Sequence, residues 1–155
     1  MSILARGLIL IAAGIGGTAV AAGPPSPPGA EYYREADPAA MTLPFSEAVR
    51  VGNMLYLSGA IGTDESGKLV AGGMAAEATQ TMDNIEAVLK RHGSSFDKVV
   101  QCTVALADIK DWPAFNDIYR HYFTLHFPAR MAFAATGLAL GARVEVQCNA
   151  TLGAN

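Results

Sequence analysis

Charged side chains are scarce in this sequence, and basic ones are fewer than acidic ones. Of its 155 residues 16% are charged, and 11 Lys and Arg stand against 14 Asp and Glu. Nucleic-acid binding depends on grouped basic side chains that neutralise phosphates, and the sequence contains no such group. A chain of this length predicts one domain with a sizeable core. The sequence therefore favours a small globular protein whose partner is not nucleic acid.

Histidine and nucleophile motifs are also lacking. The three histidines are His92, His121 and His126, and the last two are five residues apart, so they do not share a helical face well. This number and spacing predict no metal site, and no metal or organic cofactor is implied. Ser58 lacks the Gly-x-Ser-x-Gly surroundings and the placed histidine of an activated serine. A metal centre and a serine nucleophile are therefore both disfavoured.

Only two cysteines are present, Cys102 and Cys148, and both lie in segments predicted to be strands. Counting by twos, Cys102 shares an apolar face with Val100, Val104 and Leu106, so its side chain is expected in the core. Two cysteines fit an exported protein with either one disulfide or two buried thiols. Because buried free cysteines behave as small apolar side chains, we expect two thiols rather than a bridge.

Residues 1–22 have the organisation of a signal peptide. Arg6 precedes an apolar run at residues 8–15, and the small residues that follow predict cleavage after Ala21 or Ala22. An uncleaved membrane anchor is the alternative, but the apolar run is short and rich in Gly and Ala. We therefore expect an exported, periplasmic protein that no membrane segment holds after cleavage.

The sequence after the signal peptide divides into two parts. Residues 23–42 are a proline-rich linker and N-terminal segment, in which Gly-Pro-Pro-Ser-Pro-Pro predicts a stiff, extended chain. Residues 43–155 are expected to form the folded domain. Removal of the signal peptide removes Arg6 and leaves 10 basic and 14 acidic residues, a net charge of −4.

Hydrophobic periodicity and turn residues predict an α+β domain. Gly52-Asn53 separates two short apolar segments and indicates a β-hairpin. Apolar residues at helical spacing from Ala78 to Leu89 predict one buried helix face, and Gly93 is placed to end that helix. The expected elements are strands 46–51 and 54–58, helix 74–92, strand 98–108, a helix from 111 to about 126, and strands 131–136 and 143–152. This order predicts a mixed β-sheet with two helices packed on one face.

The other face of the predicted sheet is polar but carries little charge. On the last strand this face holds Glu145, Gln147, Asn149 and Thr151. On the central strand it holds Val99, Gln101, Thr103 and Ala105. Such a face is expected where a sheet meets other subunits rather than water.

Two ionisable residues are the leading candidates for chemistry. Arg130 follows a proline-set bend at Phe127-Pro128-Ala129, and its guanidinium can bind a carboxylate through two parallel hydrogen bonds. Glu145 lies between two valines of the last predicted strand. The ordinary alternatives are a surface salt bridge for the arginine and a structural role beside it for the glutamate. We expect the two to form a compact pair that binds an anion and handles a proton.

Five short motifs occur in a characteristic order along the domain. They are Pro44-Phe45-Ser46-Glu47-Ala48, Leu57-Ser58-Gly59, Asn116-Asp117-Ile118-Tyr119, Phe127-Pro128-Ala129-Arg130 and Val144-Glu145-Val146. In this order and spacing the set resembles the RidA (YjgF/UK114) family of small imine and enamine deaminases. The resemblance extends over about Pro44 to Leu152, which is most of the predicted mature chain.

The resemblance implies a fold, an assembly and an activity. Family members adopt a chorismate-mutase-like fold and form homotrimers, with their sheets lining a central barrel and clefts between neighbouring subunits. The implied reaction is hydrolytic deamination of 2-iminobutanoate, 2-iminopropanoate or similar small imino and enamine acids to 2-keto acids and ammonia. The implied ligand is a small 2-imino or 2-keto carboxylate, with no cofactor.

The resemblance also implies roles for individual residues. Arg130 holds the substrate carboxylate, and Glu145 positions or activates the water that attacks the imine carbon. Four further residues are implied to bind substrate: Phe45, Ser58, Gly59 and Asn116.

Two departures from the family pattern bear on this activity. Many members have tyrosine where this chain has Phe45, and many have cysteine where it has Ala132. The pocket therefore loses a hydroxyl and a thiol, although Arg130 and Glu145 are kept. A non-catalytic periplasmic protein that binds small carboxylates is the alternative reading of these changes. A ribonuclease role, which has been attached to some members, is disfavoured by the acidic net charge.

Overall fold

The computed structural model describes residues 29–34 and 43–153. The predicted signal peptide, its cleavage site and most of the 23–42 segment lie outside the described residues. Within the described part, none of the helices combines the length and the apolar character needed to cross a membrane.

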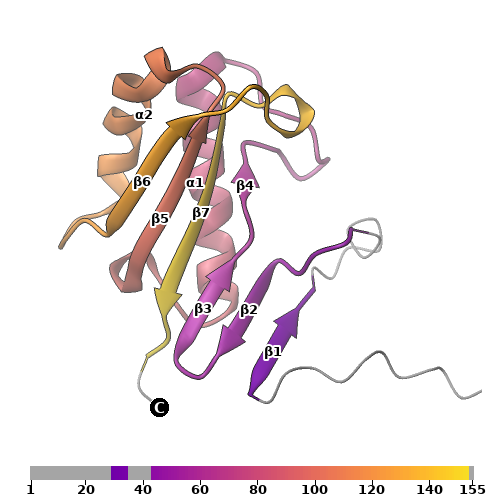
Figure 1. The fold of residues 1–155 in the computed structure, drawn as a ribbon, viewed down its shortest axis with the longest axis vertical. Helices are drawn as coiled ribbons and strands as arrows, with labels where there is room; N and C mark the ends of the chain where they lie inside the picture. The colour runs from indigo at the N-terminus through magenta and orange to yellow at the C-terminus, as the bar shows by residue number, and fades with distance from the viewer. Residues whose placement is uncertain (1–28, 35–42, 154–155) are drawn as a thin grey trace, which may run out of the picture.

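Within the described residues, seven strands form one mixed sheet, and two α-helices cover one of its faces (Figure 1). The strands are β1 Ala30–Tyr33, β2 Ala48–Val51, β3 Met54–Leu57, β4 Ala60–Ile61, β5 Val99–Leu106, β6 Ala129–Ala134 and β7 Val144–Thr151. Their order is β1-β2-β3-β7-β5-β6, and β4 pairs with β7 beyond the end of β3. Only β5 and β6 are parallel among the described pairs. The predicted α+β fold is confirmed.

Helix α1, Gly73–Arg91, packs on the sheet through the apolar stripe that the sequence predicts. Four residues of the stripe are at most 1% exposed: Ala78, Met82, Ile85 and Leu89. Gly93 follows the helix with a φ of 76°, a left-handed conformation that glycine adopts without strain. The end of α1 therefore lies where the sequence places it.

Helix α2, Trp112–Tyr119, is shorter than the helix predicted from 111 to about 126. Pro113 occupies its first turn, where a missing N–H costs no helical hydrogen bond. After Tyr119 the chain tightens into a 3₁₀ turn, Arg120–Tyr122, and Phe123 is already extended. The helix connects the parallel strands β5 and β6 and lies behind them in Figure 1.

Strand β1 is not predicted by the sequence, because its four residues lie in the segment interpreted as a linker. It pairs antiparallel with β2 at the edge of the sheet. The ring of Tyr33 stacks on His92 at the end of α1, with the centroids 4.3 Å apart. Glu47 contacts both residues: its N–H donates to Tyr33 O at 2.9 Å, and its Oε1 lies 2.7 Å from His92 Nε2. Side-chain contacts to α1 therefore hold this edge strand.

A β-bulge near the start of β5 reverses the predicted sides of two residues. Val99 pairs with Ala150 whereas Gln101 pairs with Asn149, so Val100 is an extra residue in its strand. As a result Val99 is 1% exposed and Val100 is 44% exposed. The expectation that Val100 faces the core and Val99 the open face is therefore wrong.

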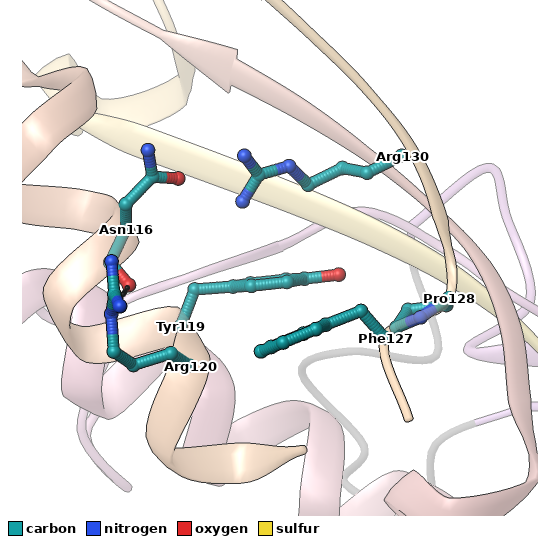
Figure 2. A pocket seen from close by; sticks show the side chains of 6 residues that line it. All are labelled: Asn116, Tyr119, Arg120, Phe127, Pro128 and Arg130. Atoms are coloured by element: carbon teal, nitrogen blue, oxygen red, sulfur yellow. Dashed lines mark hydrogen bonds between the residues drawn. The ribbon is translucent and has the colours of Figure 1, made fainter. Parts of the chain in front are cut away.

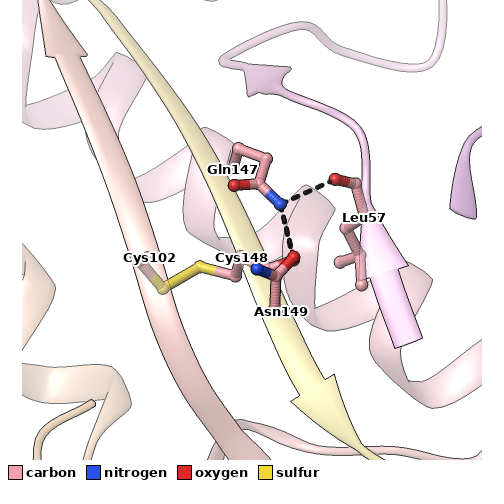
Figure 3. The surroundings of a disulfide bond; sticks show 5 residues. All are labelled: Leu57, Cys102, Gln147, Cys148 and Asn149. Atoms are coloured by element: carbon pink, nitrogen blue, oxygen red, sulfur yellow. Dashed lines mark hydrogen bonds between the residues drawn. A yellow bond between two sulfur atoms is a disulfide. The ribbon is translucent and has the colours of Figure 1, made fainter. Parts of the chain in front are cut away.

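Cys102 and Cys148 form a disulfide, so the expectation of two free thiols is wrong (Figure 3). The two residues lie directly opposite each other on the antiparallel strands β5 and β7, with their Cα atoms 4.1 Å apart. Both are fully buried. Alternation places each cysteine on an apolar face, but the register that makes them neighbours cannot be read from either strand alone.

The disulfide should contribute about 4 kcal/mol to the free energy of unfolding, because it closes a loop with a sequence separation of 46 residues. Urea titration of the oxidised wild type and of the Cys102→Ala/Cys148→Ala variant measures this difference. Wild type refolded in reductant is the control for lost side-chain packing. Mass analysis that finds both thiols free to alkylate in unreduced, denatured protein would show that the bridge is absent.

Candidate functional site

Arg130 lies at the start of β6, on the face of the sheet that the helices cover. Its register partner in β5 is the buried Cys102. The guanidinium carbon lies 4.6 Å from the ring centroid of Tyr119 and 5.9 Å from those of Trp112 and Phe115. Spacings of three and four residues place these rings on one side of α2. The side chain of Arg130 is therefore held against an aromatic surface.

A cleft of about 450 Å³ opens beside this guanidinium (Figure 2). Its lining residues are Asn116, Tyr119, Arg120, Phe127, Pro128 and Arg130. Two buried polar atoms of the lining, Asn116 Oδ1 and the Tyr119 hydroxyl oxygen, have no hydrogen-bond partner among the described residues. The amide oxygen of Asn116 points toward the guanidinium in Figure 2. Because buried polar groups are ordinarily paired, the Asn116 amide oxygen is left available to a ligand in the cleft.

Arg130 is not neutralised within the described part of the chain. No described carboxylate lies within 4.0 Å of it, whereas Arg120 pairs with Asp117 and Arg143 with Asp111. A half-buried guanidinium without a counter-charge attracts an anion, and its planar fork fits a carboxylate. This geometry can accommodate a small anion such as a carboxylate.

Glu145 lies near the start of β7, on the open face of the sheet. Its register partners are Ala105 in β5 and Ile61 in β4. Gly59 lies against its carboxylate, and a Cβ atom built on Gly59 would collide with Glu145 Oε1. Only glycine leaves this room, so the structure brings together two of the residues that the sequence predicts.

Ser58 and Gly59 lie between β3 and β4, where the ladder to β7 is interrupted. Gln147 spans the interruption, since its Nε2 donates to Leu57 O at 3.0 Å and to Asn149 Oδ1 at 2.6 Å (Figure 3). The Leu57 carbonyl lies where the ladder to β7 is interrupted, and it accepts the first of these hydrogen bonds. The irregular segment beside Glu145 is therefore fixed by a side chain of the same strand.

The hydroxyl of Ser58 supports the loop before β2. Ser58 Oγ donates to Ser46 O at 2.7 Å, and Ser58 N donates to Glu47 O at 2.9 Å. Phe45, in the same loop, is 52% exposed. Ser58 thus holds the loop that carries Phe45, and its O–H is already donated within the chain.

Arg130 and Glu145 lie on opposite faces of the sheet. Their register partners in β5, Cys102 and Ala105, are three residues apart, and side chains of a strand alternate between its faces. The compact pair expected from the sequence is therefore not formed within one chain. The physical reason is that the two faces depend on how β5 pairs with β6 and with β7. The residue pattern of one strand does not specify this register.

The predicted residues instead form two separate groups. The cation half-site is Asn116 and Arg130, and the acid half-site is Ser58, Gly59 and Glu145. Tyr119 belongs to one of the sequence motifs but is not among the residues predicted to bind substrate. The signal that could have found it is the run of aromatic residues at 112, 115 and 119, which share one helix face before the arginine.

These features define a small α+β protein with a cationic cleft at the edge of a mixed sheet. The family described as Endoribonuclease L-PSP matches residues 35–152. The chain belongs to this family, which is the one that its motifs indicated under the name RidA. The resemblance found in the sequence is confirmed.

Named relatives are similar over most of the chain. The 2-iminobutanoate/2-iminopropanoate deaminase of Capra hircus is 47% identical over 111 residues, covering 71% of this chain and 81% of that protein. The protein of the same name from Homo sapiens is 46% identical over the same length and shares. The crystal structure of an L-PSP protein from Entamoeba histolytica superposes with a TM-score of 0.70 at 43% identity, covering 78% of this chain and 94% of that one.

Proposed function

We propose that this protein hydrolyses small 2-imino acids and their enamine tautomers to 2-keto acids and ammonia. The observation that carries the proposal is the guanidinium of Arg130, held in a cleft without a counter-charge among the described residues. The deaminases from Capra hircus and Homo sapiens support it through the activity in their names. In the reaction, water adds to the imine carbon, a proton moves to nitrogen, and ammonia leaves as the C–N bond breaks.

Each half-site has a distinct task in this reaction. Arg130 binds the substrate carboxylate through two N–H groups, and the Asn116 amide borders the same cleft. Glu145 orients the attacking water and accepts its proton, while Gly59 leaves room for the carboxylate. Because a C=N bond is labile, positioning and one proton-handling group suffice for the rate, and no cofactor is needed.

The active site is formed between two chains of a homotrimer. Arg130 and Glu145 face opposite sides of the sheet, so one chain cannot present both to one substrate. The open face also carries exposed apolar side chains that another subunit can cover. They are Tyr56, 43% exposed, Met131, 57% exposed, and Phe133, 44% exposed. A weakly charged face with exposed apolar side chains suits a subunit interface.

Mixed trimers should recover activity that neither parent variant has. Arg130→Ala removes only the cation half-site and Glu145→Gln only the acid half-site, so each variant alone should be nearly inactive. In trimers co-assembled from equal amounts, about one quarter of the shared sites combine an intact half from each chain. The mixture should therefore regain about a quarter of wild-type kcat/KM per site, measured after co-refolding.

The control for this experiment is the same pair of variants mixed without unfolding, which should stay inactive. Light scattering should give the mass of a trimer for each protein. Co-refolded trimers without any recovered activity, or a monomer at micromolar concentration, would contradict a shared site.

The deaminase activity itself is tested by following 2-iminopropanoate as it is generated from an amino acid. Free imines hydrolyse unaided, so the enzyme must accelerate ammonia release above that background. A protein that binds pyruvate but gives no acceleration is the non-catalytic carboxylate-binding alternative, to which Phe45 and Ala132 point. An RNA-directed role predicts salt-dependent RNA binding, which the acidic net charge disfavours.

We also propose that the protein is exported to the periplasm. The Cys102–Cys148 disulfide supports this, since such bonds persist in oxidising compartments. Intact-mass analysis of the exported protein should give a chain that begins at Ala22 or Gly23. Retention of residues 1–20 would instead indicate a membrane anchor.

A further inference from the structure

The ring of Tyr119 is the aromatic surface nearest to the Arg130 guanidinium. It lies 4.6 Å away, compared with 5.9 Å for the rings of Trp112 and Phe115. Tyr119 is 4% exposed, and its own ring packs against Phe115 at 5.4 Å and Phe123 at 4.7 Å. Figure 2 shows the ring extended beneath the side chain of Arg130. The guanidinium therefore rests on a ring that its neighbours hold in place.

An aromatic support leaves the guanidinium N–H groups free. A carboxylate support would accept those N–H groups and compete with the carboxylate of a ligand. A ring face attracts the cation through its quadrupole and accepts none of the in-plane hydrogen bonds. Other described arginines, including Arg50, Arg91 and Arg143, pair with carboxylates. Arg130 is thus fixed in position while its hydrogen-bonding edge stays available.

We propose that Tyr119 is a positioning residue for the substrate carboxylate and acts through Arg130. Its ring face holds the guanidinium at the cleft, so that less side-chain freedom is lost when a carboxylate binds. This inference rests on the proposed function, in which Arg130 binds the substrate carboxylate. The carboxylate is bound equally in the ground state and the transition state, so the effect belongs in KM and Kd rather than in kcat.

The hydroxyl of Tyr119 has no part in this role. It is buried without a partner among the described residues, and burial raises the pKa of Tyr119 to about 12 although Arg130 lowers it. The group therefore stays a neutral hydroxyl at neutral pH. Removing a buried hydroxyl that has no partner breaks no hydrogen bond. Tyr119→Phe should consequently keep the positioning function and should not lower Tm.

The test compares variants that keep the ring with variants that lose it. Tyr119→Leu should raise KM for 2-iminopropanoate and Kd for pyruvate by about 2- to 30-fold, with kcat changed less than about twofold. Tyr119→Met, which fills more of the volume, should behave in the same way if the leucine variant folds poorly. Tyr119→Phe should match wild type in KM and Kd. Calorimetric titration with pyruvate gives Kd without turnover.

The matched control is Phe96→Leu, which removes a buried ring whose described ring contacts are with Tyr122 and Phe123, not with Tyr119 or the guanidinium. It should lower Tm but leave Kd for pyruvate unchanged. The inference is overturned if both ring-free Tyr119 variants bind pyruvate like wild type, or if Phe96→Leu weakens binding equally. It is also overturned if Tyr119→Phe loses as much affinity as Tyr119→Leu, or if wild type binds no pyruvate. Wild type that binds pyruvate but does not accelerate imine hydrolysis refutes the deaminase proposal alone.

Discussion

Replacing Glu145 by glutamine should lower kcat by about 10²–10⁴-fold, the usual contribution of a general base. Glutamine keeps the shape of the side chain beside Gly59 but cannot accept the proton of the attacking water. The carboxylate of the substrate is bound elsewhere, by Arg130, so KM should change much less than kcat. Initial rates of ammonia release, read above the uncatalysed hydrolysis, measure both constants.

The control for this variant is Glu86→Gln, an exposed carboxylate on α1 that pairs with Lys90. It should keep wild-type kcat and wild-type Tm. A Glu145→Gln enzyme with kcat within about threefold of wild type would remove Glu145 from the chemical step. Glu145 would then have only a structural role at the subunit interface, which is the alternative given for it in the sequence analysis.

Replacing Arg130 by lysine should lower kcat/KM by about tenfold to several-hundredfold. Lysine keeps the positive charge but cannot form two parallel hydrogen bonds to a carboxylate, and each charge-assisted bond is worth about 1.5–3 kcal/mol. An ammonium group also stacks less well on the aromatic rings of α2, so the variant should bind pyruvate more weakly as well, with a higher Kd. Steady-state kinetics and calorimetric titration measure the two effects.

Arg50→Lys is the matched control, because Arg50 is a surface residue that pairs with Glu31. Its kcat/KM should equal that of wild type, since exposed pairs contribute little and this one lies outside the half-sites. If wild type is active and Arg130→Lys is equally active, the carboxylate is bound somewhere else and the cation half-site is wrongly assigned.

The sequence predicts well those elements whose residue pattern lies within one short segment of the chain. The stripe from Ala78 to Leu89 sets the buried face of α1, and Gly93 ends the helix through its own backbone freedom. Gly52-Asn53 sets the first hairpin in the same local way. Short apolar periods and turn residues carry enough information for elements of this kind.

Features that depend on register between strands could not be predicted in this way. The bulge at Val100 reverses two side chains, and the pairing of Cys102 with Cys148 joins residues that are far apart in the sequence. The motifs identified the family of the chain correctly. They could not show that Arg130 and Glu145 face opposite sides, because that depends on which residue of β5 stands opposite each.

The disulfide between β5 and β7 has a consequence for how reliably the protein is made. A slip of one residue between these strands would turn every side chain of one strand to the wrong face, including Glu145 of β7. Cys102 and Cys148 face each other only in the native register, so a slipped chain keeps its thiols apart and unbonded. The disulfide can therefore form only in chains whose strands pair in the native register, and oxidation selectively stabilises those chains.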